Sequence, residues 1–355
     1  MPLGGGKEII LKQAFTNVVG NRALRQKLFD HVMQKKLSHA YILEGELGSG
    51  KHTVALSLAA ALACEREDDS NAPLPCGDCP SCRKILSGNS PDVIYIHREE
   101  NKTTLGINVI RELKSDVYVA PNDLDVKIYI LEEAHLMTDE AQNAFLLTLE
   151  EPPSYVLFVL LCETSATLLE TVKSRAPIWR MEPVSPEEIR EFLLSHHREA
   201  KDLQGSAPQE LDELVAAANG SIGRALSLLS AGERKPILRR REAAREFVRL
   251  AMGSQNSVAA MKHLLGLGQK REELLRQFQT NLLCLRDLLL LKQTEQAPLC
   301  FFADREEALT LAYSFTTPRL LRLCDCIEEA CDKLRIKSNV RLTMTALAVG
   351  AGLLS

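Results

Sequence analysis

The stretch HAYILEGELGSGKHT, residues 39–53, decides the fold. A short apolar segment predicts a strand at 39–45, a glycine-rich loop follows, and small residues suited to packing on a sheet continue as a helix. Gly45, Gly50 and Lys51 match the phosphate-binding pattern G-x-x-x-x-G-K-[ST], but His52 stands where Ser or Thr is expected. Glycines let the backbone wrap around phosphates, and the lysine neutralises them. Because a strand precedes the loop and a helix follows it, we interpret it as a phosphate-binding loop rather than a chance glycine-rich turn.

Strand-like and helix-like segments alternate through the first half of the chain. Further strands are expected at 92–96, 126–133 and 155–162, and helices at 51–64, 106–119 and 139–151. This alternation predicts a parallel sheet with helices on both faces. The nearly continuous apolar strands fit burial on both sides. The fold class is therefore α/β in this part.

The remainder of the chain reads as helical. Ser185 is a helix cap, Pro186 occupies the first helical position, and two glutamates follow, which together form a strong helix start. Beyond the charged run at 232–247, helical periodicity continues to the end. We predict three domains: an α/β domain at 1–181 with a cysteine-rich insert at 64–82, an all-α domain at 182–240, and a second all-α domain at 241–355.

Composition limits the classes of protein to consider. The chain has 355 residues, 45% of them hydrophobic and 25% charged, which is typical of a soluble globular protein. The formal charge of −4 argues against a general basic nucleic-acid binder, although a local patch is compatible with it. The longest apolar run, 155–162, is too short to span a bilayer, and residues 1–10 lack the pattern of a signal peptide. We expect a cytoplasmic location and no membrane partner.

Four of the ten cysteines form a cluster with the spacing C-x11-C-x2-C-x2-C: Cys64, Cys76, Cys79 and Cys82. Four thiolates in a tetrahedron suit a structural Zn²⁺ ion. A redox CxxC pair and an iron–sulfur site are the alternatives, but a redox pair does not need four cysteines and nothing else indicates electron transfer. We therefore predict zinc. The other six cysteines are interpreted as small buried hydrophobic residues: Cys162, Cys284, Cys300, Cys324, Cys326 and Cys331.

Two further features carry candidate chemistry. The strand VKIYILEE ends in Glu132 and Glu133, the pattern in which one carboxylate holds a metal ion and the next polarises water. Solvated acids at a strand end are the alternative, but the position downstream of a phosphate-binding loop favours the functional interpretation. Arg175 follows the last strand region, and a lone arginine there is usually solvated or ion-paired.

Taken together, SHAYILEGELGSGKHT, CGDCPSC, KIYILEEAHLMTDEAQNAFLLTLEEPP and VKSRAPIWR resemble the bacterial DNA polymerase III clamp-loader subunits of the AAA+ class. The resemblance is strong over residues 15–230 and weaker through the tail. That family forms a five-subunit ring that opens the sliding clamp and places it on primed DNA. Its gamma/tau subunits are ATPase motors, and its delta-prime subunit does not hydrolyse ATP. The resemblance implies an AAA+ domain, a helical lid and a helical collar, with delta and gamma/tau subunits as partners.

Several positions depart from the motor subunits of this family. His52 replaces the metal-binding hydroxyl residue, and Thr53 lies one position later, where a helix turns its side chain by roughly 100°. Glu132 replaces an aspartate, whereas Glu133 matches the catalytic glutamate. The family's sensor 1 threonine aligns at Cys162 or Glu163, with Thr164 nearby. Its sensor 2 arginine aligns at Gly223, which leaves Arg224 one place out of phase. The degenerate nucleotide-binding set is Val18, Val19, Gly45, Gly48, Gly50, Lys51, His52, Thr53, Glu132, Glu133 and Arg224.

Arg175, in contrast, matches the residue type that the family has at this position. In the family, a Ser-Arg-Cys element projects an arginine finger into the ATP site of the neighbouring subunit. The corresponding residues in this chain are Ser-Arg-Ala. The resemblance implies a non-hydrolysing stator of the delta-prime type that supplies Arg175 in trans. An active gamma/tau-like ATPase is the main alternative, because Lys51 and Glu133 remain. A stand-alone AAA+ motor that remodels DNA is a second alternative. Whether ATP or ADP binds the loop is left open.

Overall fold

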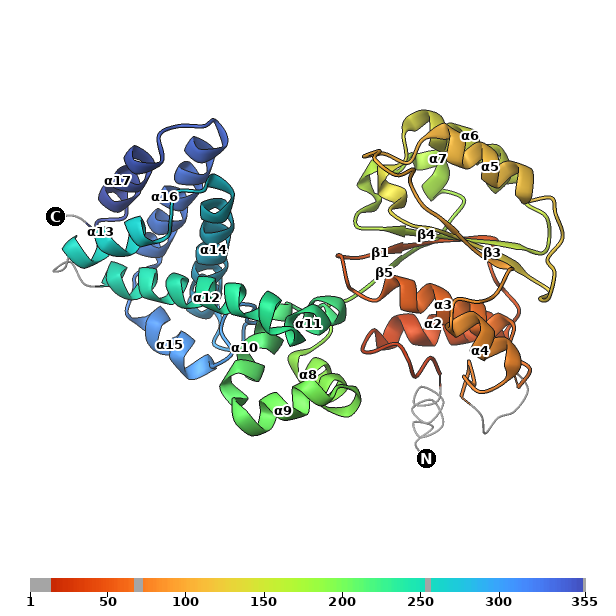
Figure 1. Ribbon diagram of the computed structural model, residues 1–355, viewed down its shortest axis with the longest axis horizontal. Coiled ribbons are helices and arrows are strands. Elements are labelled where there is room, and N and C mark those ends of the chain that lie inside the picture. Colours follow the sequence, from red (N-terminus) through yellow and green to blue (C-terminus); the bar gives the residue numbers. More distant parts are fainter. Residues whose placement is uncertain (1–13, 67–72, 253–256, 354–355) are drawn as a thin grey trace. The chain divides into compact units, whose positions relative to one another are not determined.

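The computed structural model describes residues 14–66, 73–252 and 257–353. The chain divides into two compact units, each described here by itself (Figure 1). Unit 1 comprises Met1–Ile189 with Gly220–Gly223, and unit 2 comprises Arg190–Asn219 with Arg224–Ser355. Residues 1–10, on which the expected location rests, and the part of the cysteine-rich insert at 67–72 lie outside the described residues.

Unit 1 is built on a parallel sheet of five strands in the order β2-β3-β4-β1-β5. Every residue of β3 and β4 is buried. This is expected for apolar strands that have a neighbouring strand on each side and helices on both faces. The four strands expected from the sequence are confirmed, and β5 is an additional short edge strand. The strands are β1 (Ala40–Glu44), β2 (Val93–Ile96), β3 (Lys127–Leu131), β4 (Val156–Cys162) and β5 (Ile178–Arg180).

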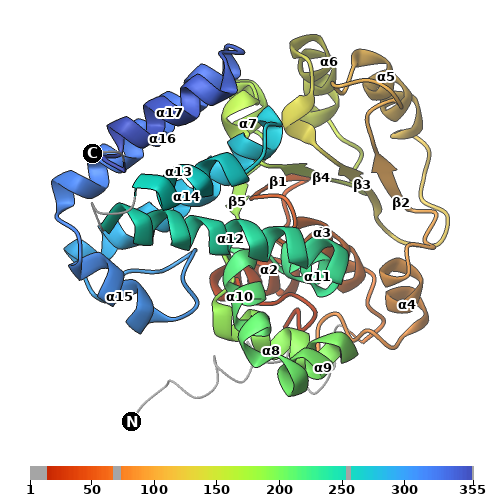
Figure 2. The same cartoon turned by 60° about the vertical axis from the view of Figure 1, so that its left-hand side comes forward.

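Helices cover both faces of this sheet, as predicted (Figure 1, Figure 2). One face packs against α2 (Arg22–Met33), α3 (Lys51–Leu62) and α4 (Pro80–Leu86). The other packs against α5 (Ile107–Asp116), α6 (Asp139–Glu150) and α7 (Glu170–Lys173). Two short 3₁₀ helices, η1 (Ala134–Leu136) and η2 (Ser165–Thr167), follow β3 and β4.

The predicted helix start at Ser185 is confirmed in its hydrogen bonds. The Ser185 hydroxyl accepts from the Glu188 N–H at 3.2 Å, and the Glu188 carboxylate accepts from the Ser185 N–H at 3.3 Å. This reciprocal pair satisfies two amide donors that the first helical turn would leave without partners. The helix that follows is α8 (Pro186–His196).

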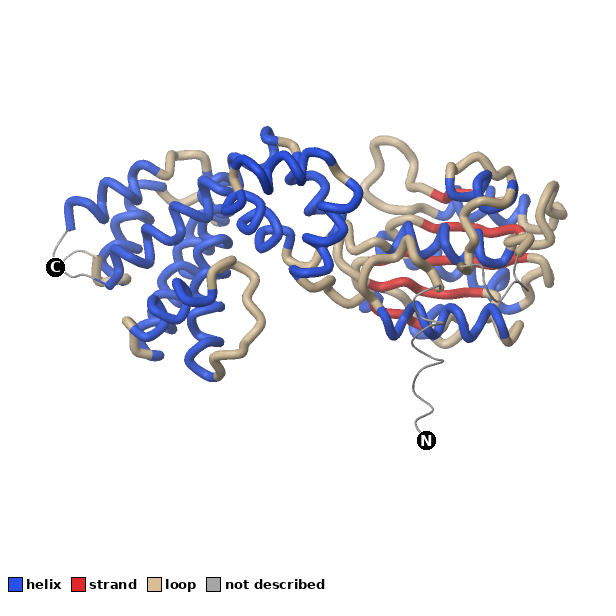
Figure 3. The backbone as a smooth tube through the Cα atoms, turned by 90° about the horizontal axis from the view of Figure 1, so that it is seen from below, coloured by secondary structure: helices blue, strands red, loops and turns tan. Residues whose placement is uncertain are grey.

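Unit 2 is all-helical in its described residues (Figure 3), as expected. Its helices bury one large apolar core, in which α14 packs against α12, α15 and α16. Residue 240, where we place a domain boundary, lies inside α12, and the three-domain division stays a prediction. The helices after α8 are α9 (Arg198–Ser206), α10 (Pro208–Ala218), α11 (Ile222–Leu229), α12 (Ala231–Met252), α13 (Ser257–Gly266), α14 (Arg271–Gln293), α15 (Arg305–Tyr313), α16 (Thr317–Arg335) and α17 (Val340–Gly350).

None of the helices in the described ranges combines the length and the apolar character needed to cross a bilayer.

Candidate nucleotide site and cysteine cluster

The glycine-rich loop connects β1 to α3 with the backbone that its glycines permit. Gly48 and Gly50 have φ angles of 76° and 95°, the left-handed region that favours glycine. Lys51 begins α3, and its Nζ donates to the carbonyl oxygens of Gly45 at 2.5 Å and Glu46 at 2.8 Å. Burial is the main influence on its pKa and lowers it from the ordinary value. The lysine therefore lies folded back on its own loop.

Residues 220–223 close over this loop within unit 1. The Gly223 N–H donates to the Gly48 carbonyl at 2.9 Å, and the Ser221 hydroxyl donates to the Leu47 carbonyl at 3.2 Å. A Cβ added to Gly223 would lie 2.7 Å from the Gly48 Cα. Position 223, where the resemblance places the sensor 2 arginine, therefore has no room for a side chain. Arg224 follows on α11, is exposed and belongs to unit 2.

Two imidazoles and a carboxylate meet where the sequence predicts the metal-binding residues of the loop. His52 Nε2 lies 3.6 Å from Glu132 Oε1, and His97 Nδ1 lies 3.2 Å from Glu132 Oε2. The Tyr95 ring stacks against both imidazoles, with centroid distances of 5.3 Å to His52 and 6.1 Å to His97. Thr53 is exposed on α3. His52 and Glu132, predicted as separate departures, are thus direct neighbours.

Glu133 is held by an arginine. Its φ of 48° places it in the left-handed region directly after β3. Arg98 Nε donates to Glu133 Oε2 at 2.7 Å, and Arg98 Nη1 donates to the Lys102 carbonyl at 2.7 Å. The sequence analysis missed Arg98 and His97. Their position directly after β2 was the available signal, since β2 pairs with β3 and the ends of parallel neighbours meet at one edge.

The remaining predicted positions differ in their surroundings. Cys162 ends β4 fully buried, its thiol donates to the Leu43 carbonyl at 3.7 Å, and burial raises its pKa to about 12. The Glu163 N–H donates to His135 Nδ1 at 3.3 Å. Val18 is a buried member of the core beneath α2 and α3, and Val19 is half-buried. These valines contribute packing near the loop.

The four predicted cysteines meet at the junction of α3 and α4. All four are buried, and their sulfur atoms lie within 4.8 Å of one another. The Cys79 N–H donates to the Cys76 sulfur and the Cys82 N–H to the Cys79 sulfur, both at 3.4 Å. Gly77 has a φ of 77°, which lets the chain turn between Cys76 and Cys79. Burial opposes ionisation of Cys76, but the N–H groups of Cys79 and Asp78 outweigh it and lower its pKa to about 7.

The six other cysteines are only partly as expected. Cys162, Cys284 and Cys331 are buried, whereas Cys300, Cys324 and Cys326 are half-buried. Cys324 and Cys326 pack against the helical core, so their hydrophobic role is as expected although their burial is partial, whereas the Cys300 sulfur accepts from Arg286 Nη1 at 3.1 Å.

Arg175 is ion-paired within its own chain. Its Nη2 lies 2.5 Å from Glu150 Oε1 at the end of α6, and its Nη1 donates to the Thr171 carbonyl at 2.9 Å. The side chain remains 33% exposed. In this structure Arg175 is therefore an ion-paired surface residue, which is the alternative to the arginine finger.

The chain is similar to known proteins over part of its length. Residues 20–185 match the family described as DNA polymerase III, delta subunit. The chain is 34% identical over 219 residues to the DNA polymerase III subunit tau of Bacillus subtilis (strain 168), covering 61% of this chain and 37% of that protein. It is 36% identical over 141 residues to the delta' subunit of Yersinia pestis, covering 40% and 41%. Over these residues the chain is related to subunits of DNA polymerase III.

The chain spans well under two thirds of the length of both relatives. Among solved structures, a gamma subunit-related protein from Thermotoga maritima is similar with a TM-score of 0.42 and 19% identity, covering 92% of this chain and 98% of that one.

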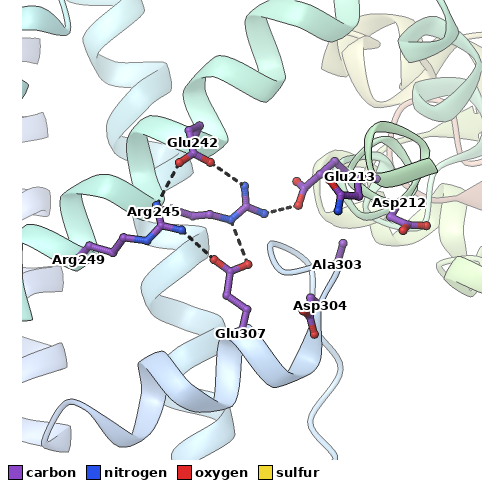
Figure 4. A pocket seen from close by; sticks show the side chains of 9 residues that line it. Asp212, Glu213, Glu242, Arg245, Arg249, Ala303, Asp304 and Glu307 are labelled. Atoms are coloured by element: carbon purple, nitrogen blue, oxygen red, sulfur yellow. Dashed lines mark hydrogen bonds and ion pairs between the residues drawn. The ribbon is translucent and has the colours of Figure 1, made fainter. Parts of the chain in front are cut away.

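Unit 2 contains a charged cavity that the sequence analysis missed (Figure 4). Its volume is about 660 Å³, and acids outnumber bases in its lining. Arg245 donates to Glu213, and its Nε lies 3.5 Å from Glu307. Arg249 reaches Glu242 at 3.1 Å and Glu307 at 3.2 Å. The charged run at 232–247 lies within α12, and its Glu242 and Arg245 take part in these ion pairs.

Proposed function

We propose that this chain is a delta-prime-type clamp-loader subunit that does not hydrolyse ATP. The observation that carries the proposal is the ion pair between Arg98 and Glu133, with Arg98 Nε 2.7 Å from the carboxylate. A carboxylate that polarises water needs its lone pairs directed at that water. Here the arginine occupies one oxygen and is itself anchored on the Lys102 carbonyl. Glu133 is therefore poorly placed to act as a base.

Two further observations support a site without turnover. His52 and Glu132 contact each other where a hydroxyl and an aspartate would hold Mg²⁺. Position 223 lacks the space for an arginine that would reach the phosphates. Phosphoryl transfer depends on positioning and on charges around the transition state, so the loss of both groups removes most of the catalysis.

The proposed role in the assembly is that of a stator. We infer a five-subunit ring with delta and gamma/tau subunits that loads the sliding clamp on primed DNA, in which Arg175 reaches the ATP site of a neighbour. Arg175 is one-third exposed and held by Glu150, a partner that it can exchange for phosphate oxygens. The collar is proposed to lie within the helical part of unit 2.

The proposal that the chain does not hydrolyse ATP is tested by measuring ATP hydrolysis by the purified full chain. We expect no turnover above the background of a Lys51→Ala control. A Lys51-dependent rate of about 1 s⁻¹, ordinary for an NTPase, would contradict the stator and favour an active enzyme.

The arginine finger is tested in a loader reconstituted with gamma/tau and delta subunits. We expect Arg175→Ala to lower hydrolysis at the neighbouring site by about 10³-fold or more, because an arginine in trans stabilises the transition-state charge. Arg198→Ala is the matched control, since Arg198 is 91% exposed on α9. DNA-stimulated hydrolysis that is equal in the two variants would show that Arg175 is not the finger.

An active gamma/tau-like ATPase is the second candidate. It is favoured by the retention of Lys51 and Glu133 and by the match to a tau subunit over 219 residues. The hydrolysis assay with the Lys51→Ala control separates the two candidates.

We also propose that the four cysteines hold a structural Zn²⁺ ion. Four sulfurs at 2.3 Å from a tetrahedral zinc lie about 3.8 Å apart. The Cys76 and Cys82 sulfurs are 3.9 Å apart, and backbone N–H groups already point at two of the four sulfurs. We expect native mass spectrometry to detect one zinc per chain, lost in Cys79→Ser and kept in Cys300→Ser. Equal zinc content in both variants would contradict the site.

A further inference from the structure

We propose that Arg224, Arg240 and Arg276 form a phosphate-binding surface in unit 2 that contacts the backbone of the primed DNA. The choice of DNA as the source of the phosphates rests on the proposed function, whereas the surface itself rests on the arrangement of the three arginines. A formal charge of −4 for the whole chain is compatible with a local basic surface of this kind.

The three arginines come from three helices. Arg224 lies on α11, Arg240 near the middle of α12 and Arg276 in the second turn of α14. The buried Gln277 joins the last two helices, because its Nε2 donates to the Arg240 carbonyl at 2.9 Å and to Asn281 Oδ1 at 2.8 Å. The helices α12 and α14 are therefore fixed against each other at the level of Arg240 and Arg276 (Figure 1).

The charges of these arginines repel one another. Burial is the main cause that lowers the pKa of Arg240, and the positive charges of Arg276 and Arg224 lower it further. An arginine stays protonated in a protein, so the repulsion persists in the folded chain. A bound anion is the means by which such a group of like charges is stabilised.

Other arginines of α12 differ in having carboxylate partners. Among the ion pairs that the described residues make, none includes Arg240 or Arg276, whereas four arginines of α12 are paired: Arg234, Arg241, Arg245 and Arg249. The charged segment at 232–247 thus contains arginines that hold unit 2 together and one, Arg240, whose charge is left for a ligand.

The exposure and chemistry of the three side chains suit phosphate groups. Arg224 and Arg276 are exposed and Arg240 is half-buried between solvent and the helical core, so a ligand can reach all three. A planar guanidinium group matches the oxygens of a phosphate with two parallel hydrogen bonds. Three such groups on separate helices can engage successive phosphates of a nucleic-acid backbone, which carries one charge per nucleotide.

The test is the binding of the purified full chain to a fluorescent primed duplex, followed by anisotropy over about 50–200 mM salt. Each phosphate contact contributes about −0.9 to the slope of log K against log salt concentration. We expect Arg240→Gln and Arg276→Gln each to reduce the size of this slope by about 0.9, and the double variant by about 1.8. The weakening should be the same for two duplexes of different sequence, since phosphate contacts carry no sequence information.

Arg198→Gln is the matched control, because Arg198 is 91% exposed on α9 and has its own carboxylate partner, Asp202, at 3.9 Å. It should leave the slope unchanged. Thermal unfolding reports whether each variant is folded, and Arg276→Gln, at an exposed position, should unfold at the temperature of the parent. The proposal is overturned if the parent does not bind the duplex at low salt, if the parent and the variants share one slope, or if Arg198→Gln lowers the slope as much as they do.

Two further probes separate DNA from other anions. Poly-glutamate of matched length represents an acidic protein, and inorganic phosphate represents a free anion. If either bound as tightly as the duplex and lost binding in the same variants, DNA would not be the partner. The assay contains neither ATP nor a neighbouring subunit, so its failure is separate from that of the proposed function, which the hydrolysis assay tests.

Discussion

At the scale of single residues, Asp92 shows how one buried carboxylate fixes a turn. It lies fully buried just before β2 and accepts the N–H groups of Asn122 at 2.6 Å, Asp123 at 2.7 Å and Leu124 at 2.9 Å. Burial opposes its ionisation, but these three donors outweigh that effect, and the pKa of Asp92 lies below its ordinary value. The charged form therefore stabilises the turn that leads into β3.

We expect Asp92→Ala to lower the free energy of unfolding by about 3 kcal/mol at pH 7, because three backbone N–H groups lose their carboxylate acceptor. Since the pKa of Asp92 is depressed by folding, its stabilisation is present above the pKa of the unfolded chain, near 4, and is lost as the pH falls through the folded value. The difference between variant and parent should therefore shrink in acid. Urea unfolding at pH 7 and at about pH 3 measures it. Asp123→Ala, on the same turn but exposed, is the control, and an equal loss in both variants would contradict the role of Asp92.

Gly223 provides a second test at this scale. A methyl group there would lie 2.7 Å from the Gly48 Cα, which is a backbone atom. We therefore expect Gly223→Ala to destabilise unit 1. Gly205 in α9 has open space around its added Cβ, and Gly205→Ala should stabilise by about 0.5–1 kcal/mol, as alanine does in helices. Thermal unfolding of the two variants should move in opposite directions. A shift of the same sign in both would remove the argument that position 223 excludes a side chain.

At the scale of elements, one carboxylate joins two helices of unit 2, and one of its arginine partners reaches a third segment. Glu213 on α10 accepts from Arg241 Nε at 2.8 Å and from Arg245, both on α12. Arg241 also stacks over the Phe301 ring at 4.6 Å, in the segment before α15. Both arginines are buried; Arg241 is paired with Glu213, whereas Arg245 also pairs with Glu242 and Glu307. The cavity shown in Figure 4 lies beside this junction.

We expect Glu213→Gln to cost about 3 kcal/mol, because buried Arg241 loses its carboxylate partner, while Arg245 keeps Glu242 and Glu307. The matched control is Glu242→Gln, since Glu242 also pairs with Arg245 but is 63% exposed, and exposed pairs contribute roughly 0–1 kcal/mol. Hydrogen exchange of α10 and α12 amides reports the two effects. Equal protection in both variants would place the stabilisation outside this network.

The elements themselves show where sequence reasoning succeeds. The apolar runs of β1, β3 and β4 carry their own signal, because a strand buried on both faces has few polar residues. The edge strand β5 has three residues directly after Pro177, too few for any periodicity. The helix α4 has seven residues, begins within the cysteine-rich insert and was missed for the same reason. The twelve-residue α2 was not predicted either, so length alone does not make an element readable from its periodicity.

At the scale of the whole molecule, strand order determines which residues lie together beside the glycine-rich loop. The sequence pattern alone does not reveal that order. The cysteines were predicted because their spacing is local. His97 and Arg98 were missed because they reach Glu132 and Glu133 only through the pairing of β2 with β3. The contact of residues 220–223 with the loop was missed for the same reason, since it joins segments far apart in the sequence. Motif spacing identifies chemistry, and topology decides which residues share it.

The two units have separate cores, which predicts that they respond separately to damage. Phe278 is fully buried in the core of unit 2, and Phe158 is fully buried in the sheet of unit 1. Removing either ring should cost about 3–5 kcal/mol in its own core. Because cooperative units open independently, we expect Phe278→Ala to speed hydrogen exchange in α14 and α16 while β3 and β4 keep their protection, and Phe158→Ala to do the reverse. If either variant exposed both sets of amides equally, the two units would form a single cooperative body.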